Sequence, residues 1–125
     1  MTMIRLRATG PRTGFDALLA DLHGVAPVLL TDPQQIDALL RRAAEAAGAR
    51  ILHSHFHTFG PGQGVTGVLL LAESHLSIHT WPEHGFAAAD IFMCGPAAPQ
   101  RALDVVSAAF MPREQRVQTI ERGQL

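Results

Sequence analysis

The chain has 125 residues, of which 47% are hydrophobic and 17% charged, and its formal net charge is -1. This balance excludes a disordered chain and provides no basic surface for nucleic acid, so we expect no nucleic-acid partner. The single cysteine, Cys94, excludes an internal disulfide and fits a reducing compartment. The longest apolar run, residues 68–72, falls far short of the roughly 20 residues that span a membrane. We therefore expect one soluble, cytoplasmic domain over residues 1–125.

The first half of the chain predicts a tail, a strand and a helix. Residues 5–14 are basic and punctuated by Gly and Pro, which indicates a loose tail or an edge extension. Residues 17–25 are typical of a first strand. A helix should follow Asp32, a residue suited to the N-cap, with Pro33 at its first position and Gly48 just past its end.

The second half predicts four strands, a helix and a closing strand. Short Gly- and Pro-containing turns separate the four strands, so consecutive strands should be antiparallel neighbours. Pro99 should open the second helix, which runs to Phe110. The strands are expected at residues 49–59, 64–73, 75–81, 85–94 and 113–123.

This order favours an α+β fold in which two helices pack on one face of an antiparallel sheet. Residues 64–73 and 86–94 carry apolar side chains at both parities, so the other face should be buried as well. A second copy of the chain covers it most simply. We therefore predict a homodimer in which two sheets pack face to face.

Two kinds of site compete for the polar residues. His53, His55 and His57 alternate on one predicted strand and point to one side, but neighbours about 7 Å apart are widely spaced for ligands of one ion, so we expect no metal. Ser74 and His79 suggest a serine hydrolase, yet the glycines of a nucleophile elbow are absent around Ser74.

Residues 72–95 read AESHLSIHTWPEHGFAAADIFMCG. This stretch closely resembles the prokaryotic S-adenosylmethionine decarboxylase proenzyme family, whose members carry a segment like ESHxSIHTWPExGxAAxDxFxCG. Weaker similarity continues upstream through GVTGVLLLAESH, FHTF and LLADLHGV. The resemblance thus covers most of the chain from about Ala17 onward.

The resemblance implies a chain that makes its own cofactor. Ser74 would attack the carbonyl of Glu73, and cleavage would leave residues 1–73 and a second chain, residues 74–125, that begins with a pyruvoyl group. That group would form a Schiff base with the substrate amine and accept the electrons released on decarboxylation. His79 matches the family's processing base, and Cys94 matches the acid that reprotonates the α-carbon.

The resemblance also implies a substrate site for S-adenosylmethionine. Phe59 would stack on the adenine, Glu83 would accept hydrogen bonds from the ribose, and Trp81 would line the same pocket. Thr66 stands where a serine that assists processing is expected. In the family's arrangement, Phe59 and the pyruvoyl group come from different protomers of the dimer.

Departures from the family pattern leave the substrate open. Ala17 stands where members of the family commonly have a histidine, and Thr58 stands where they often have an arginine. The leading interpretation is an S-adenosylmethionine decarboxylase of polyamine (spermidine) biosynthesis. A pyruvoyl-dependent arginine or ornithine decarboxylase is the alternative, and a non-catalytic homologue that acts as a binding subunit is a third.

Overall fold

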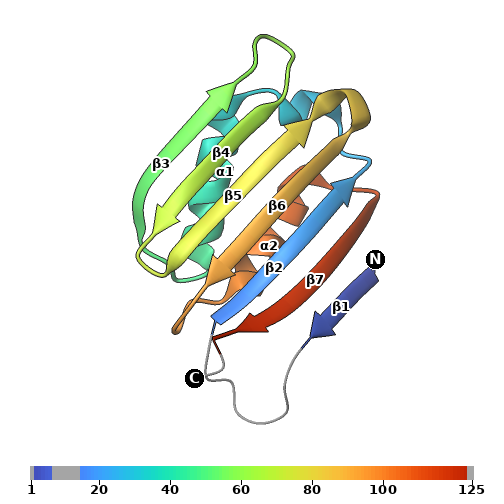
Figure 1. The fold of residues 1–125 in the computed structure, drawn as a ribbon. Coiled ribbons are helices and arrows are strands. Elements are labelled where there is room, and N and C mark those ends of the chain that lie inside the picture. Colours follow the sequence, from blue (N-terminus) through green and yellow to red (C-terminus); the bar gives the residue numbers. More distant parts are fainter. Residues whose placement is uncertain (1, 7–14, 124–125) are drawn as a thin grey trace.

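The computed structural model describes residues 2–6 and 15–123. One sheet contains seven strands in the order β1-β7-β2-β6-β5-β4-β3 (Figure 1). The strands are β1 (Thr2–Leu6), β2 (Phe15–His23), β3 (Ile51–Thr58), β4 (Val65–Leu71), β5 (Ser74–Trp81), β6 (Phe86–Met93) and β7 (Glu114–Arg122). Helices α1 (Pro33–Ala46) and α2 (Pro99–Phe110) cover one face, and short 3-10 helices η1 (Pro27–Leu30) and η2 (Pro82–His84) lie in connections.

The α+β class, the two helices and the six strands from β2 to β7 are confirmed. Strand β1 adds a seventh strand at the edge of this antiparallel sheet, and it pairs in parallel with β7. The geometric reason is that β1 and β2 flank β7 and run in opposite directions, so β7 is antiparallel to β2 and parallel to β1. Of the predicted tail, residues 5 and 6 belong to this edge strand, and residues 7–14 lie outside the described residues.

Helix α1 forms where its punctuation predicted. The Asp32 carboxylate accepts hydrogen bonds from the backbone N–H groups of Gln34 and Gln35, at 2.9 and 3.4 Å, and so caps the first turn. Pro33 occupies the first helical position, and Gly48 follows the helix with a φ of 79°, which a glycine adopts without strain. The apolar side chains of the helix and its C-cap are buried, namely Ile36, Leu39, Leu40, Ala43 and Ala47.

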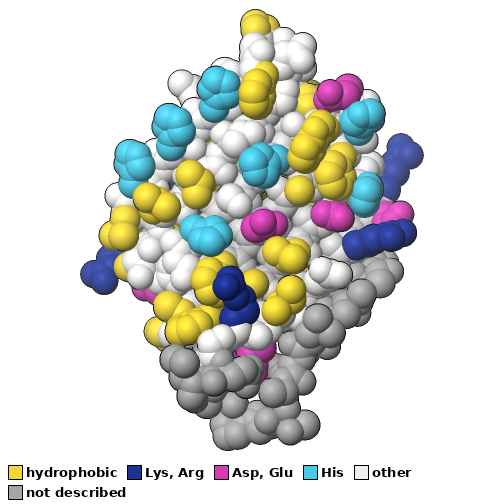
Figure 2. Space-filling model, in the orientation of Figure 1, with side chains coloured by type: hydrophobic (Ala, Val, Ile, Leu, Met, Phe, Trp, Pro, Cys, Tyr) yellow, Lys and Arg dark blue, Asp and Glu magenta, His cyan; other side chains and the backbone are white. Residues whose placement is uncertain are grey.

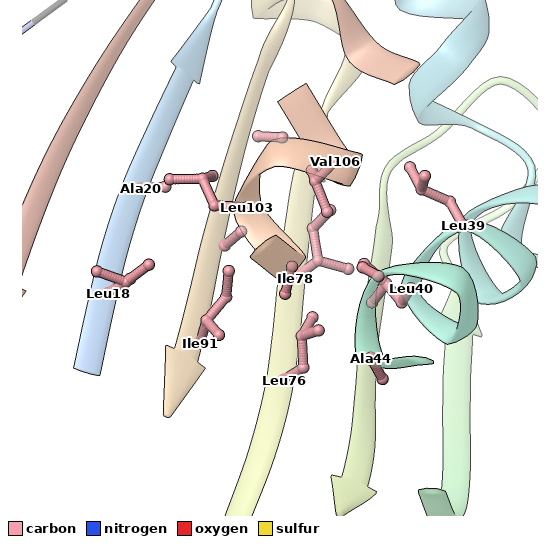
Figure 3. Close-up of a cluster of buried hydrophobic side chains, with 14 of the residues drawn as sticks. Leu18, Ala20, Leu39, Leu40, Ala44, Leu76, Ile78, Ile91, Leu103 and Val106 are labelled. Atoms are coloured by element: carbon pink, nitrogen blue, oxygen red, sulfur yellow. The ribbon is translucent and has the colours of Figure 1, made fainter. Parts of the chain in front are cut away.

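The core lies between the helices and the sheet (Figure 3). Alternate residues of β2 and β5 point into it, among them Leu18, Ala20, Leu76 and Ile78, and they meet α1 and α2. The opposite face of the sheet, here called the open face, carries no helix (Figure 1). It presents hydrophobic, histidine and acidic side chains side by side (Figure 2). Within residues 2–6 and 15–123, no helix is long and apolar enough to cross a membrane.

Candidate active site

The turn between β4 and β5 holds Ser74 in an unusual backbone conformation. Only Ala72 and Glu73 separate the two strands, and Leu71 pairs directly with Ser74. Ser74 has a φ of 146°, a region that side chains other than glycine rarely adopt. Such a residue costs on the order of 1–3 kcal/mol and persists only where its surroundings enforce it. Strain is therefore concentrated at the predicted cleavage position.

The carbonyl oxygen of Glu73 accepts two hydrogen bonds. It accepts a hydrogen bond from the backbone N–H of Cys94 at 3.1 Å and another from the Cys94 thiol, also at 3.1 Å. The Glu73 carboxylate accepts from the backbone N–H of Arg50 at 2.9 Å. These contacts fix the turn from two sides. We call Glu73, Ser74 and Cys94 the cleavage-turn cluster.

A hollow of about 290 Å³ lies at the opposite end of β4 and β5. We call it the loop-side pocket, because the β3–β4 loop forms one wall. Its lining residues are Phe59, Gln63, Gly64, Thr66, His79, Thr80, Trp81 and Glu83. Four residues predicted for the site, Phe59, Thr66, Trp81 and Glu83, thus share one pocket with His79.

Thr66 and His79 form a side-chain pair in this pocket. They are directly opposite each other on β4 and β5, and the Thr66 hydroxyl lies 3.0 Å from His79 Nδ1. When Nδ1 carries the proton, it donates to the hydroxyl, and Nε2 is left as a free base. The Trp81 ring lies beside His79 with a centroid separation of 6.3 Å. The pair therefore orients a base in an aromatic surrounding.

Buried contacts hold the floor of the pocket. The Thr80 hydroxyl donates to the carbonyl of Leu30 at 2.7 Å and accepts from the N–H of Val65 at 2.8 Å, which ties η1 to the strands. Gly64 passes so close to β5 that a Cβ there would clash with the Thr80 carbonyl oxygen. Only glycine fits that position without a shift of the backbone.

The two groups of predicted site residues are far apart within one chain. Ser74 and His79 are five positions apart on β5, which corresponds to about 16 Å along the strand. The structure brings Glu73, Ser74 and Cys94 together, and it brings Phe59, Thr66, His79, Trp81 and Glu83 together. It does not bring the first set to the second. One chain therefore carries two separate groups of predicted site residues, which we call the two half-sites because the predicted dimer would join them.

The three alternating histidines of β3 lie outside both half-sites. His53, His55 and His57 pair with Leu70, Val68 and Thr66 across β4, so all three face the open side of the sheet, as predicted. They are exposed. No group of three or more His, Cys, Asp or Glu side chains in the described part of the chain is placed to hold a metal ion.

Two features of the site were missed from the sequence. Gln63 lines the loop-side pocket, but the GPGQG stretch indicated only a turn. The second is the contact of Cys94 with the Glu73 carbonyl, which joins residues 21 positions apart. The pairing of β5 with β6 brings them together, and no local sequence signal marks it.

Comparisons with known proteins identify the family of the chain. Residues 16–123 match the family model described as S-adenosylmethionine decarboxylase. The S-adenosylmethionine decarboxylase proenzyme of Hydrogenobaculum sp. is 43% identical over 107 residues, which cover 85% of this chain and 79% of that protein. The proenzyme of Aquifex aeolicus is 44% identical over 107 residues, covering 85% and 78% of the two chains.

A solved structure shares the fold as well. The crystal structure of the adenosylmethionine decarboxylase from Aquifex aeolicus superposes with a TM-score of 0.85 at 40% sequence identity. The match covers 92% of this chain and 95% of that chain. The chain belongs to the S-adenosylmethionine decarboxylase family.

Proposed function

We propose that the protein is a self-processing, pyruvoyl-dependent decarboxylase that converts S-adenosylmethionine to its decarboxylated form, an aminopropyl donor for polyamine synthesis. Membership of the family and the names of the similar proenzymes favour this substrate over arginine or ornithine. The observation that carries the proposal is the cleavage-turn cluster, in which a strained Ser74 follows a carbonyl held by two donors.

Self-cleavage begins at Ser74. Its hydroxyl attacks the carbonyl carbon of Glu73, and the negative charge that develops on the carbonyl oxygen is stabilised by the N–H and thiol of Cys94. The C–N bond breaks and an ester forms. Removal of the Ser74 α-proton then breaks the bond between Cβ and Oγ of Ser74 and expels the new main-chain carboxylate of Glu73, which leaves dehydroalanine at position 74. Addition of water and loss of ammonia give residues 1–73 and a pyruvoyl-led chain, residues 74–125.

The strained backbone at Ser74 supports this sequence of steps. Conversion of the amide to an ester releases Ser74 from its strained φ of 146°. Part of the conformational cost of that φ therefore lowers the activation barrier of self-cleavage. No metal is required by these steps. The pyruvoyl carbonyl supplies the electron sink for decarboxylation of an amino acid bound through its amine.

The other residues of the proposed site bind the substrate and move protons. Cys94 faces the cleavage position and would return a proton to the substrate α-carbon. Phe59 is 65% exposed and offers a free aromatic face for adenine, with Trp81 beside His79 on the same pocket. The Glu83 carboxylate would accept hydrogen bonds from the ribose hydroxyls.

A homodimer completes this site. Because His79 and Ser74 of one chain are about 16 Å apart along β5, His79 cannot act on its own Ser74. A two-fold axis through the open face would set the cleavage-turn cluster of one protomer against the loop-side pocket of the other. The exposed Leu19, Leu70 and Trp81 give that face apolar area to bury. We also propose that the enzyme works in the cytoplasm, where its single cysteine stays reduced.

Two measurements test the proposed function. Intact mass of the purified protein should show two fragments, with a pyruvoyl group on the second, whereas a single uncleaved chain would favour a non-catalytic binding subunit. Release of labelled carbon dioxide is then measured with S-adenosylmethionine, arginine and ornithine in parallel. Release from S-adenosylmethionine alone supports the assignment, and release only from arginine or ornithine refutes it.

A further inference from the structure

The β3–β4 loop, residues 59–64, is held in one conformation by its own hydrogen bonds. The N–H of Phe59 donates to the carbonyl of Gly64 at 3.2 Å, and the N–H of Gln63 donates to the carbonyl of Gly60 at 3.0 Å. The Thr58 hydroxyl also donates to the Gly60 carbonyl and accepts from the Gly60 N–H, both at 3.3 Å. The loop therefore presents its side chains from a fixed backbone.

Gln63 and Phe59 face the same pocket from this loop. The Gln63 stem lies back over Gly60, where its Cγ is 3.6 Å from the position that a Cβ would occupy. Within the described residues, no hydrogen bond holds the Gln63 carboxamide. One loop thus supplies both an aromatic ring and a carboxamide to the lining of this pocket, and Glu83 lines it as well.

Gln63 is also the wall between two hollows. Besides the loop-side pocket of about 290 Å³, it lines a neighbouring hollow of about 580 Å³ beside η1, and Glu83 lines both. If a ligand stacks on the Phe59 ring, a carboxamide in this place can approach that ligand laterally. The edge of that ligand, and not its face, would meet Gln63.

We infer that Gln63 is a specificity-determining residue that reads the edge of the substrate's adenine. The 6-amino group of adenine is a donor and N7 is an acceptor, and a glutamine carboxamide pairs with both at once. This inference rests on the proposed function. It adds recognition of the base by hydrogen bonds to stacking on Phe59, and arginine or ornithine would leave the carboxamide unused.

The test combines a substitution with a changed substrate. Gln63→Met keeps an unbranched side chain of similar length, so the wall between the hollows remains, but it removes both hydrogen-bonding groups. The 7-deaza analogue of S-adenosylmethionine lacks the N7 acceptor. Pro61→Ala is the matched control in the same loop, because Pro61 offers no side-chain hydrogen bond. The ratio of kcat/KM for the two substrates is measured for all three proteins.

The wild type and Pro61→Ala should prefer S-adenosylmethionine over the 7-deaza analogue by about threefold to tenfold, the value of one neutral hydrogen bond. In Gln63→Met the ratio should fall to about one, while self-cleavage proceeds as in the wild type. An unchanged ratio in Gln63→Met overturns the inference and leaves the proposed function intact. A wild type that releases no carbon dioxide from S-adenosylmethionine overturns both.

Discussion

The carbonyl oxygen of Glu73 accepts hydrogen bonds from both the backbone N–H and the thiol of Cys94, each at 3.1 Å. Cys94 follows Met93, which pairs with Ser74 across β5 and β6, so Cys94 contacts the carbonyl of the peptide bond that precedes Ser74. The N–H belongs to the backbone and survives any substitution other than proline. The thiol, by contrast, can be removed or replaced, so the two donors can be separated by experiment.

Replacing Cys94 by Ala should slow self-cleavage by about threefold to tenfold without abolishing it, because a weak donor is lost while the N–H remains. Decarboxylation by the cleaved Cys94→Ala enzyme should fall much further, since its proton donor is absent. The appearance of fragments, followed by mass spectrometry, gives the first rate, and carbon dioxide release gives the second.

Cys94→Ser is the matched control, because its hydroxyl restores a donor to the Glu73 carbonyl. It should cleave faster than Cys94→Ala while it remains a poor decarboxylase. If Cys94→Ala cleaved at the wild-type rate, the thiol would have no part in stabilising the oxyanion. If it also kept full turnover, Cys94 would not be the proton donor.

The strain at Ser74 predicts a difference between two variants that cannot cleave. Ser74→Ala and Ser74→Gly both lack the hydroxyl, so each should give a single chain and no activity. Glycine accepts a φ of 146° and alanine does not, so Ser74→Gly should be more stable by about 1 kcal/mol. Thermal or denaturant unfolding of the two uncleaved proteins measures the difference. Equal stabilities would show that the turn stores no strain at this position.

Local signals predicted the elements well. The Asp32 cap, Pro33 and Gly48 marked the ends of α1, and the same signals exist in the structure as hydrogen bonds and a positive φ. Gly- and Pro-containing turns separated the runs that form β3 to β6, because such turns mark where one strand ends and the next begins. Strand β1 was harder to predict, because an edge strand that pairs in parallel with the last strand has no nearby turn to mark it.

The residues of the site likewise fall into those that a local sequence signal marks and those that only the folded structure brings together. Ser74, His79 and Cys94 came from a motif, and Thr66 and His79 are opposite each other because their strands are consecutive. The separation of Ser74 from His79 could have been read from five strand positions, but only the placement of Phe59 and Glu83 in the distant pocket shows two half-sites. Gln63 was missed because its role depends on the folded loop and not on its neighbours in sequence.

The pair of Thr66 and His79 predicts that a hydroxyl, not its methyl group, is required. Thr66→Val keeps the shape of the side chain and removes the partner 3.0 Å from His79 Nδ1. We expect self-cleavage to slow by about tenfold as the ring loses its orientation. Thr66→Ser retains the hydroxyl and should cleave at close to the wild-type rate. The rates come from fragment appearance by mass spectrometry, and equal rates for the Val and Ser variants would remove Thr66 from the processing apparatus.

The two half-sites predict that two defective chains can repair each other. Ser74→Ala lacks the proposed nucleophile and His79→Ala lacks the proposed base, so each alone should remain a single chain. When the two are co-produced at equal levels, the proposed arrangement predicts mixed dimers in which Ser74 of the His79→Ala chain meets His79 of the other chain. With random pairing, about half of the His79→Ala chains should then be cleaved.

The control pairs His79→Ala with a chain that carries both substitutions, which leaves no dimer with an intact Ser74 and His79 at one site. Cleavage should be absent in that mixture. Intact mass of differently tagged chains identifies which one is cut. If His79→Ala chains are cleaved without a partner, or remain whole when Ser74→Ala is present, the two residues do not act across the dimer, and the face-to-face arrangement of the sheets fails with them.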